Sequence, residues 1–199
     1  MNVQTKPGLE ADVTGWLAER HDDMIGLLET LVNIDSGSYD KPGVDAVADA
    51  IRSFLESHGI QCDRLPIDTK GDGLRATVPG AASGQNRVVL LVGHRDTVFS
   101  KGEVSERPFT IKDGRAYGPG VADMKAGLVM NAFLLVAFSK FGGAPAPLVG
   151  LFTGDEEIGS PTSRPLIEAE ARNACAVLNS EPGRPTGNIV TGRKGGIFF

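Results

Sequence analysis

The sequence predicts an α/β fold, namely a three-layer α/β/α arrangement with a largely parallel mixed sheet. Three apolar runs, at residues 88–92, 148–152 and 174–178, lack polar alternation, which is typical of strands buried on both faces. Segments with helical spacing of apolar residues lie between these runs, and alternating strands and helices favour a layered sheet. With 199 residues and 41% hydrophobic content, the chain is long enough to form a core.

Apolar residues at helical spacing predict a first helix from about residue 13 to 34. Pro42 is a favoured first-turn residue and Gly59 is a natural C-terminal cap, so a second helix is expected over 42–58. The strongest helical pattern covers 121–141. Further expected elements are strands at 60–67 and 73–78, a hairpin of 108–111 and 115–117 around Asp113-Gly114, and a helix near 164–172.

The composition argues against nucleic acid and membrane partners. The net charge is −5 and the Lys and Arg residues are scattered, so no basic surface is expected. The longest apolar stretch, 128–138, contains Asn131 and is shorter than the ~20 residues that a membrane span needs. The N-terminus lacks the order of a signal peptide, so we expect a cytoplasmic protein. Cys62 and Cys175 make no disulfide framework, and Cys175 is expected in the core.

Acidic and imidazole side chains follow the predicted strands directly or begin a helix. In open α/β sheets, ligands and catalytic groups collect beyond the carboxyl ends of the strands. The candidates are His94 and Asp96 after the first run, Asp123 at the start of the long helix, Glu156 and Glu157 after the second run, and Glu181 after the third. One His and several carboxylates at one edge of a sheet indicate a metal site.

Taken singly, each candidate also has a plainer interpretation. His94 and Asp96 could be solvated loop residues, although a carboxylate is the usual partner of a His ligand. Asp123 could be a helix N-terminal acid, stabilised by the helix dipole. Glu156 and Glu157 could be surface acids, or one could bind a metal while the other takes a proton from water. The combination favours zinc, since two divalent ions ~3.5–4 Å apart can share a bridging carboxylate.

Other catalytic chemistries lack their motifs. The chain contains no Gly-x-Ser-x-Gly nucleophile elbow. Residues 187–192 have P-loop spacing, but Arg193-Lys194 replaces the Lys-Ser/Thr ending. Gly118-Pro119-Gly120 lacks the third glycine of a dinucleotide-binding fingerprint. The metal site remains the interpretation that the motifs favour.

Four ordered motifs resemble the co-catalytic zinc exopeptidase and deacylase family, which includes glutamate carboxypeptidase, acetylornithine deacetylase and succinyl-diaminopimelate desuccinylase. The motifs are Gly93-His94-Arg95-Asp96-Thr97-Val98, the segment from Tyr117 to Lys125, the segment from Asp155 to Ser160, and Ser180-Glu181-Pro182. The likeness runs from about Asp12 to the last residue. Segments 101–113 and 187–199 look closest to the glutamate carboxypeptidase branch.

The resemblance implies a set of metal ligands. His94 would bind one zinc ion, Asp123 would bridge two, and Glu157 and Glu181 would bind one each. A complete active site of this family holds two zinc ions. Carboxylate-rich sites also accept Co²⁺ or Mn²⁺.

The resemblance implies two further roles and one backbone feature. Glu156 would be the general base that activates the bridging water, and Asp96 would orient His94. The Asp123-Met124 peptide bond would be cis, as in relatives.

The resemblance also implies parts that this chain lacks. Relatives carry a later zinc-binding His, after an inserted lid domain that supplies substrate and homodimer contacts. We therefore expect a disordered tail over 1–12, the N-terminal part of a catalytic domain over 13–187, and truncated strands at the start of the lid over 188–199.

The expected function is hydrolysis of an amide or peptide bond in a small substrate with a carboxylate, such as an acyl amino acid or a glutamyl peptide. We expect residues 1–199 alone to have little activity, because the late His ligand is missing. One alternative is a truncated, catalytically impaired fragment that acts at most as a metal-binding or interaction module. Another is a structural α/β domain whose acids are coincidental. Four ordered motifs would then have to arise by chance, so this last alternative is disfavoured.

Overall fold

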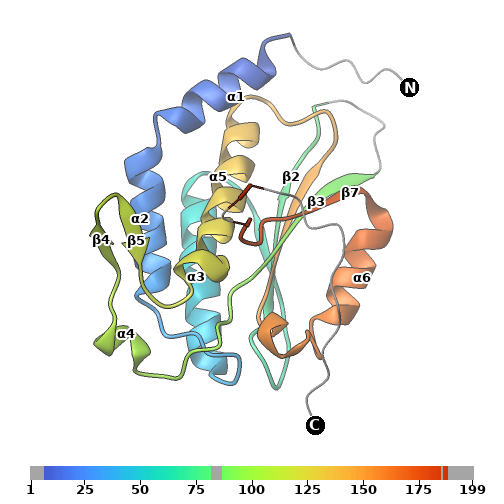
Figure 1. The fold of residues 1–199 in the computed structure, drawn as a ribbon. Helices are drawn as coiled ribbons and strands as arrows, with labels where there is room; N and C mark the ends of the chain where they lie inside the picture. The colour runs from blue at the N-terminus through green and yellow to red at the C-terminus, as the bar shows by residue number, and fades with distance from the viewer. Residues whose placement is uncertain (1–6, 82–86, 185, 188–199) are drawn as a thin grey trace.

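The structure is a computed structural model that describes residues 7–81, 87–184 and 186–187 (Figure 1). Its centre is a five-stranded sheet with the order β1-β2-β6-β3-β7. The strands are β1 (Cys62–Leu65), β2 (Gly73–Val78), β3 (Val88–His94), β6 (Leu148–Thr153) and β7 (Ala174–Asn179). β3 pairs in parallel with β6 and β7, whereas β2 pairs antiparallel with β1 and β6. The predicted mixed sheet is therefore confirmed.

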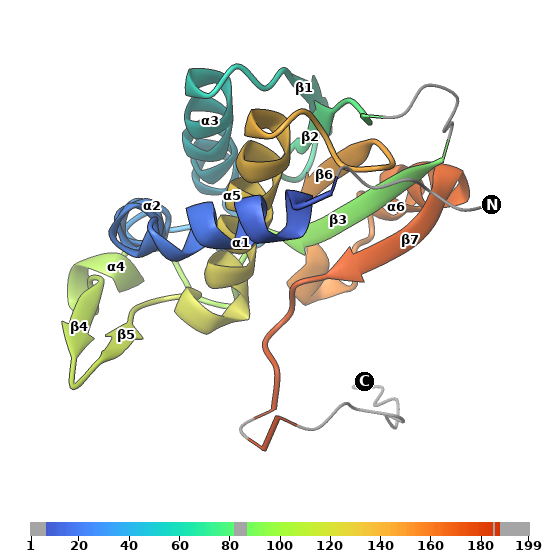
Figure 2. The same ribbon diagram turned by 90° about the horizontal axis from the view of Figure 1, so that it is seen from above.

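Helices cover both faces of this sheet, which confirms the three-layer arrangement. Figure 2 shows α6 on one face and α1, α2, α3 and α5 on the other. The helices are α1 (Leu9–Ala18), α2 (His21–Val32), α3 (Lys41–Ser57), α4 (Glu103–Glu106), α5 (Ala126–Lys140) and α6 (Arg164–Asn173). The predicted hairpin is also present, as β4 (Thr110–Lys112) and β5 (Arg115–Tyr117), with positive φ at both turn residues, Asp113 and Gly114.

The core lies on both faces of the two central strands. Leu91 and Phe152 pack with Leu128 of α5, whereas Leu90 and Leu151 lie on the α6 face. Successive residues of a strand point to opposite faces, so a strand covered on both sides needs apolar residues throughout. This explains the uninterrupted apolar runs. It also makes β3 and β6 a fixed platform for the residues that follow them.

The helix predicted over 13–34 is two helices, α1 and α2. The chain turns at Glu19 and Arg20, and Arg20 has φ −110° and ψ 18°, outside the helical range. α1 packs on α5, whereas α2 contacts both α3 and α5. One straight helix could not make both sets of contacts, so the chain turns between α1 and α2.

The predicted disordered tail over 1–12 is wrong for its last four residues, because α1 begins at Leu9. Leu9 and Val13 are buried together with Ala137 of α5, so the first turns of α1 have apolar contacts of their own. Residues 1–6 of the predicted tail, and the predicted lid strands over 188–199, lie outside the described residues.

β7 is an edge strand, and it is more exposed than its apolar sequence predicts. Only Ala174 is buried in it, and Val177 and Leu178 are 49% and 53% exposed. Cys175 is exposed as well, so its predicted place in the core is wrong. Within the described chain β7 pairs only with β3. Apolar composition alone does not distinguish a covered strand from an uncovered one.

The helix predicted over 121–141 begins with a distorted turn, η1 (Val121–Lys125), and continues as α5. Together these form the one helix in the described ranges that is long and apolar enough to cross a membrane. The sequence did not predict this, because the apolar stretch considered there, 128–138, is shorter. However, 61% of this window is buried inside the fold. Apolar residues on all sides of a helix are typical of a core position, and α5 contacts both the sheet and the other helices of its layer.

A network of charged side chains supports the start of α3. Lys41 Nζ lies 3.0 Å from Asp45 Oδ2 and 2.5 Å from Asp72 Oδ1, and Arg64 contacts the same carboxylates at 3.1 and 2.7 Å. The backbone N–H of Ile67 also donates to Asp72. Burial acts to raise the pKa of Asp72, but the hydrogen bonds from Lys41, Ile67 and Arg64 outweigh burial and lower the pKa to about 2. The fold therefore stabilises the charged carboxylate.

Asp72 should make part of the folding stability depend on acid pH. Its folded pKa of about 2 lies below its ordinary value of 3.8, so its contribution is present above 3.8 and is lost as the pH falls toward 2. Asp72→Asn should lower the unfolding free energy at neutral pH by ~1–3 kcal/mol and flatten the acid dependence. Urea unfolding at several pH values measures both effects. Asp68→Asn, at an exposed position, is the control, and an acid dependence unchanged in Asp72→Asn would contradict the assignment.

Candidate metal centre

All six predicted site residues lie beyond the carboxyl ends of strands or at the start of α5, as expected. Their positions are His94 at the end of β3, Asp96 two residues later, Asp123 in η1, Glu156 and Glu157 in a 3₁₀ turn after β6, and Glu181 after β7. Because β6, β3 and β7 are parallel neighbours, their carboxyl ends meet at one edge of the sheet. The topology therefore gathers residues that are up to 87 positions apart (94 to 181).

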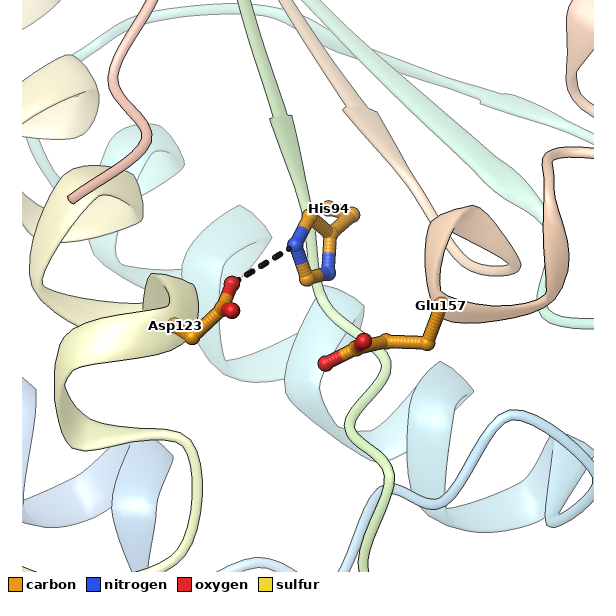
Figure 3. A group of neighbouring side chains, drawn as sticks. All are labelled: His94, Asp123 and Glu157. Carbon is orange, nitrogen blue, oxygen red and sulfur yellow. Dashed lines mark hydrogen bonds and ion pairs between the residues drawn. The ribbon is translucent and has the colours of Figure 1, made fainter. Parts of the chain in front are cut away.

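His94 is the centre of this group. Its Nε2 atom lies 3.2 Å from Asp123 Oδ1, 3.3 Å from Glu181 Oε1 and 3.7 Å from Glu156 Oε2. The carboxylates of Asp123 and Glu157 point toward a common space beside the imidazole (Figure 3). Donor atoms of His94, Asp123 and Glu157 lie within 4.8 Å of one another, and so do donor atoms of His94, Glu156 and Glu181.

The second ring nitrogen of His94 determines which atom faces the acids. Nδ1 lies 3.0 Å from the backbone oxygen of Asp96 and 3.4 Å from its carboxylate. A carbonyl oxygen only accepts hydrogen bonds, so the network assigns a proton to Nδ1. Nε2 is then the atom that can bind a metal. The His94 side chain is only 2% exposed, so the surrounding fold fixes its orientation.

The charges around His94 favour a cation at Nε2. Burial acts to lower the pKa of His94, but the hydrogen bond with Asp96 and the charges of Asp96, Glu156 and Glu181 outweigh it and raise the pKa to about 9. A metal ion that binds Nε2 replaces this proton.

Asp96 is completely buried and acts as the support of the site. Its carboxylate accepts the Ser38 hydroxyl at 2.7 Å and the backbone N–H groups of Glu156 and Glu157 at 3.0 and 3.1 Å. Burial acts to raise the pKa of Asp96, but the contacts with His94 and Ser38 outweigh it and lower the pKa. The charged carboxylate thus connects the end of β3 with the turn after β6.

The remaining carboxylates lie close together at the mouth of the site. Burial and the charge of Asp123 raise the pKa of both Glu157 and Glu181. The side chains of Asp123 and Glu156 are 55% and 51% exposed, in contrast to the buried imidazole. One imidazole at the floor and several carboxylates at the mouth are a donor set that zinc, cobalt or manganese accepts. The residues therefore fit divalent metal ions.

A close contact with α5 places Glu181. The Ser180 hydroxyl donates to Asn131 Oδ1 at 2.6 Å, and Asn131 Nδ2 donates to the backbone oxygen of Val92 at 3.4 Å. A Cβ atom at Gly127 would lie 2.2 Å from the backbone oxygen of Ser180. Only glycine lets the segment pass α5 at this distance. The buried Asn131 in an otherwise apolar helix is thus explained by this contact.

Buried neighbours hold Asp123 in place. The Asp123–Met124 peptide bond is cis, as the resemblance implied. Met124 is buried, and its Sδ atom accepts the backbone N–H of His94 at 3.2 Å. Lys125 is also buried and donates to the backbone oxygen of Ile34 at 2.9 Å. Asp123 is therefore anchored, through its neighbour Met124, to the backbone that carries His94.

Several buried polar residues near the site were not predicted, among them Ser38, Arg95 and Asp155. The guanidinium of Arg95 donates to backbone carbonyl groups of α3, of the segment before β2 and of β6. Asp155 accepts hydrogen bonds from Thr162 and Ser163, which fixes the loop after Glu157. Arg95 and Asp155 lie inside two of the four motifs, so their positions could have indicated a role at the site. Ser38 lies outside all four motifs and had none.

Comparison with known proteins agrees with this geometry. Residues 90–194, just over half of the chain, match Peptidase family M20/M25/M40. The chain belongs to this family. It is 36% identical over 162 residues to carboxypeptidase G2 of Pseudomonas sp. (strain RS-16), which covers 80% of this chain and 38% of the relative. It is 29% identical over 187 residues to succinyl-diaminopimelate desuccinylase of Rhodospirillum centenum, which covers 88% of this chain and 48% of the relative.

The fold is shared with solved members of the family. Human carnosine dipeptidase 1 superposes with a TM-score of 0.74 over 91% of this chain and 42% of that chain. Its sequence identity is 18%, so the likeness shows the fold alone. The M20 chain described here spans 38% and 48% of the length of the two curated relatives. The family resemblance of the sequence is confirmed.

Asp96→Asn should weaken metal binding. A carboxamide replaces one of the two acceptor oxygens with an N–H donor, so either the Glu156 or the Glu157 backbone N–H loses its acceptor, and it removes the negative charge beside His94. Loss of such a partner behind a metal ligand typically costs ~10–100-fold in metal affinity. Competition with a fluorescent zinc chelator measures the affinity, and urea unfolding measures the stability.

Asp155→Asn is the matched control for this experiment. Asp155 is as buried as Asp96, but its carboxylate accepts four hydrogen bonds, all from Thr162 and Ser163, rather than from the groups around His94. It should lower the stability comparably and affect metal affinity much less. Equal losses of affinity in both variants would show that Asp96 acts only through general stability.

Proposed function

We propose that this protein is a metal-dependent hydrolase of amide or peptide bonds, of the carboxypeptidase or N-acyl amino acid deacylase type. The observation that carries the proposal is the position of Asp123, Glu156 and Glu181 within 3.7 Å of the buried Nε2 atom of His94. Membership of the M20 family supports the reaction type. The proposed substrate is a small molecule with a carboxylate, such as an acyl amino acid or a glutamyl peptide.

The proposed metal ions are two zinc ions with one shared ligand. His94, Asp123 and Glu181 would hold the first, and Asp123 and Glu157 would hold the second. The 3.2 and 3.3 Å distances from His94 Nε2 to Asp123 and Glu181 support the first set of ligands. The common space between Asp123 and Glu157 supports the second. Cobalt or manganese would be accepted in place of zinc.

Glu156 is the proposed general base. The bound metal supplies Lewis-acid polarisation of the scissile carbonyl and of water. The Glu156 carboxylate takes the proton of the attacking water and gives it to the nitrogen of the leaving amine. Its side chain is 51% exposed, so it can reach substrate, while Asp96 holds its backbone N–H. The adjacent Glu157 points toward Asp123 and His94, which supports its proposed role as a ligand.

A second candidate function is a metal-binding or interaction module without turnover. The observation that favours it is the single imidazole at the site. Of the three His residues in the sequence, His21 lies in α2 and His58 stacks on Phe54 after α3, so only His94 is available. Metal stoichiometry distinguishes the two functions, because two tightly bound zinc ions favour the hydrolase and one or none favours the module.

We further propose that residues 9–187 belong to a catalytic domain in a cytoplasmic protein, and that a homodimer like that of relatives would form through the lid domain and not through these residues. The continuous contacts between α1, α5 and the sheet support the assignment to one domain. The scattered basic residues support the absence of nucleic acid and membrane partners. Sedimentation of the purified full-length protein measures the proposed dimer.

Glu156→Gln should abolish turnover and leave metal binding intact. The amide keeps the size of the side chain but cannot take a proton, and loss of a general base typically costs ~10²–10⁴-fold in rate. The assay uses zinc-loaded full-length protein with N-acyl amino acids and glutamyl peptides, and elemental analysis gives the metal content. Glu157→Gln is the contrasting variant. It should bind less metal, whereas its turnover rate per bound metal should fall much less than that of Glu156→Gln. Robust turnover by Glu156→Gln would overturn the role of Glu156.

Removal of the metal should stop hydrolysis reversibly. Dialysis against a chelator should abolish turnover, and added zinc, cobalt or manganese should restore it, because each of these ions suits the donor set. Rates and metal content are measured on the same samples. Hydrolysis that continues in metal-free protein would contradict a metal-dependent mechanism.

A further inference from the structure

A hollow of about 580 Å³ lies beside the metal centre, on the side of Glu157. The segment after β3 and the segment before α3 form its base, where the Ser38 N–H donates to the Thr97 carbonyl at 3.2 Å. Its apolar wall consists of Tyr39, Val98, Phe99 and Ile158. We refer to this hollow as the Tyr39–Val98 pocket.

Two side chains of the Tyr39–Val98 pocket are unusually exposed for their type, whereas Phe99 and Ile158 are partly buried. Tyr39 is 80% exposed and Val98 is 69% exposed. Large apolar side chains that line a concave surface next to polar groups are typical of a ligand site. Glu157 lines the pocket and also points toward Asp123 and His94 (Figure 3). A group bound in the pocket therefore lies next to the proposed reaction centre.

The charges around the pocket indicate which part of a substrate it takes. Asp40 and Glu157 contribute negative charge, and Lys101 Nζ lies 3.7 Å from Asp40 Oδ2. Lys70 Nζ lies 3.8 Å from the centre of the Tyr39 ring. The lining of the pocket therefore carries two carboxylates and one exposed ammonium group, and Lys70 is not part of it. The pocket therefore suits an uncharged group better than a carboxylate.

We propose that the Tyr39–Val98 pocket binds an uncharged apolar acyl group of the substrate and selects it over smaller or anionic acyl groups. A carboxylate-bearing amino acid would have to lie elsewhere, so the pocket takes the acyl side of the scissile bond. The inference rests on the proposed hydrolase function and names its substrate class as N-acyl amino acids with a bulky apolar acyl group. Tyr39 and Val98 are its specificity-determining residues.

The test compares three acyl groups on one amino acid. Zinc-loaded full-length protein is assayed with its N-isovaleryl, N-acetyl and N-succinyl derivatives. The wild type should prefer isovaleryl by kcat/KM, and Val98→Ser and Tyr39→Ala should each reduce that preference about tenfold, the lower end of what one apolar contact supplies. Ile111→Ser is the matched control, because Ile111 is 57% exposed but lies on the β4–β5 hairpin. Unchanged melting temperatures exclude a folding defect.

Two results would overturn the proposal. One is an isovaleryl preference that Val98→Ser and Tyr39→Ala leave unchanged, and the other is a wild-type preference for succinyl. Binding of N-isovaleryl amino acid to Glu156→Gln, measured by calorimetry, separates the pocket from the reaction. If Val98→Ser weakens this binding about tenfold in the Glu156→Gln background, the pocket is supported. If, in addition, the wild type hydrolyses none of the three derivatives, only the hydrolase function is refuted. Binding that is absent or insensitive to Val98→Ser refutes the pocket.

Discussion

The buried carboxylate of Asp96 is the interaction on which the site depends. It accepts two backbone N–H groups from the turn after β6 and a hydroxyl from the segment before α3, and its charge lies beside His94. A fully buried carboxylate is strongly unfavourable without such partners. The same hydrogen bonds that compensate for its burial therefore fix the positions of His94, Glu156 and Glu157 relative to one another.

Other buried charges extend this rigidity away from the metal centre. Arg95 has no exposed surface and binds only carbonyl groups in the hydrogen bonds of the described chain, joining β3 to β6 and α3. Burial lowers its pKa to about 10, so it remains charged at neutral pH. Asp155 ties the loop after Glu157 in the same way. The chain thus places buried charges on both sides of the candidate ligands, where each is satisfied by backbone or hydroxyl groups.

The sequence predicts those parts of the metal centre that depend on the pattern of apolar and polar residues along the chain. The ends of β3 and β6 are marked by apolar runs that stop abruptly, and parallel pairing then brings His94 and Glu157 together. The exposure of Val177 was not predicted, because an apolar strand has the same sequence pattern whether or not another element covers it. The start of α1 at Leu9 depends on contacts with α5 that no local pattern reveals.

The supports of the site were equally hidden from the sequence. Ser38 reaches Asp96 across 58 positions, and only the fold shows that a hydroxyl is needed there. Asn131 is marked by its polarity within an apolar helix, but its partner Ser180 lies 49 positions later. Motifs therefore predict the candidate ligands and Asp96, whereas supports such as Ser38 and the Asn131–Ser180 pair depend on tertiary contacts.

The contrast between a buried floor and an exposed mouth suits a site that must be both rigid and accessible. His94 and Asp96 are almost completely buried, so their geometry is set before any ligand arrives. Asp123 and Glu156 are half exposed, so they can meet a metal ion and a substrate from solvent. Electrostatic stabilisation is most effective when the supporting groups do not need to reorganise during the reaction. The hydrogen bonds of Asp96 provide that condition because they hold the backbone of Glu156 and leave its carboxylate free.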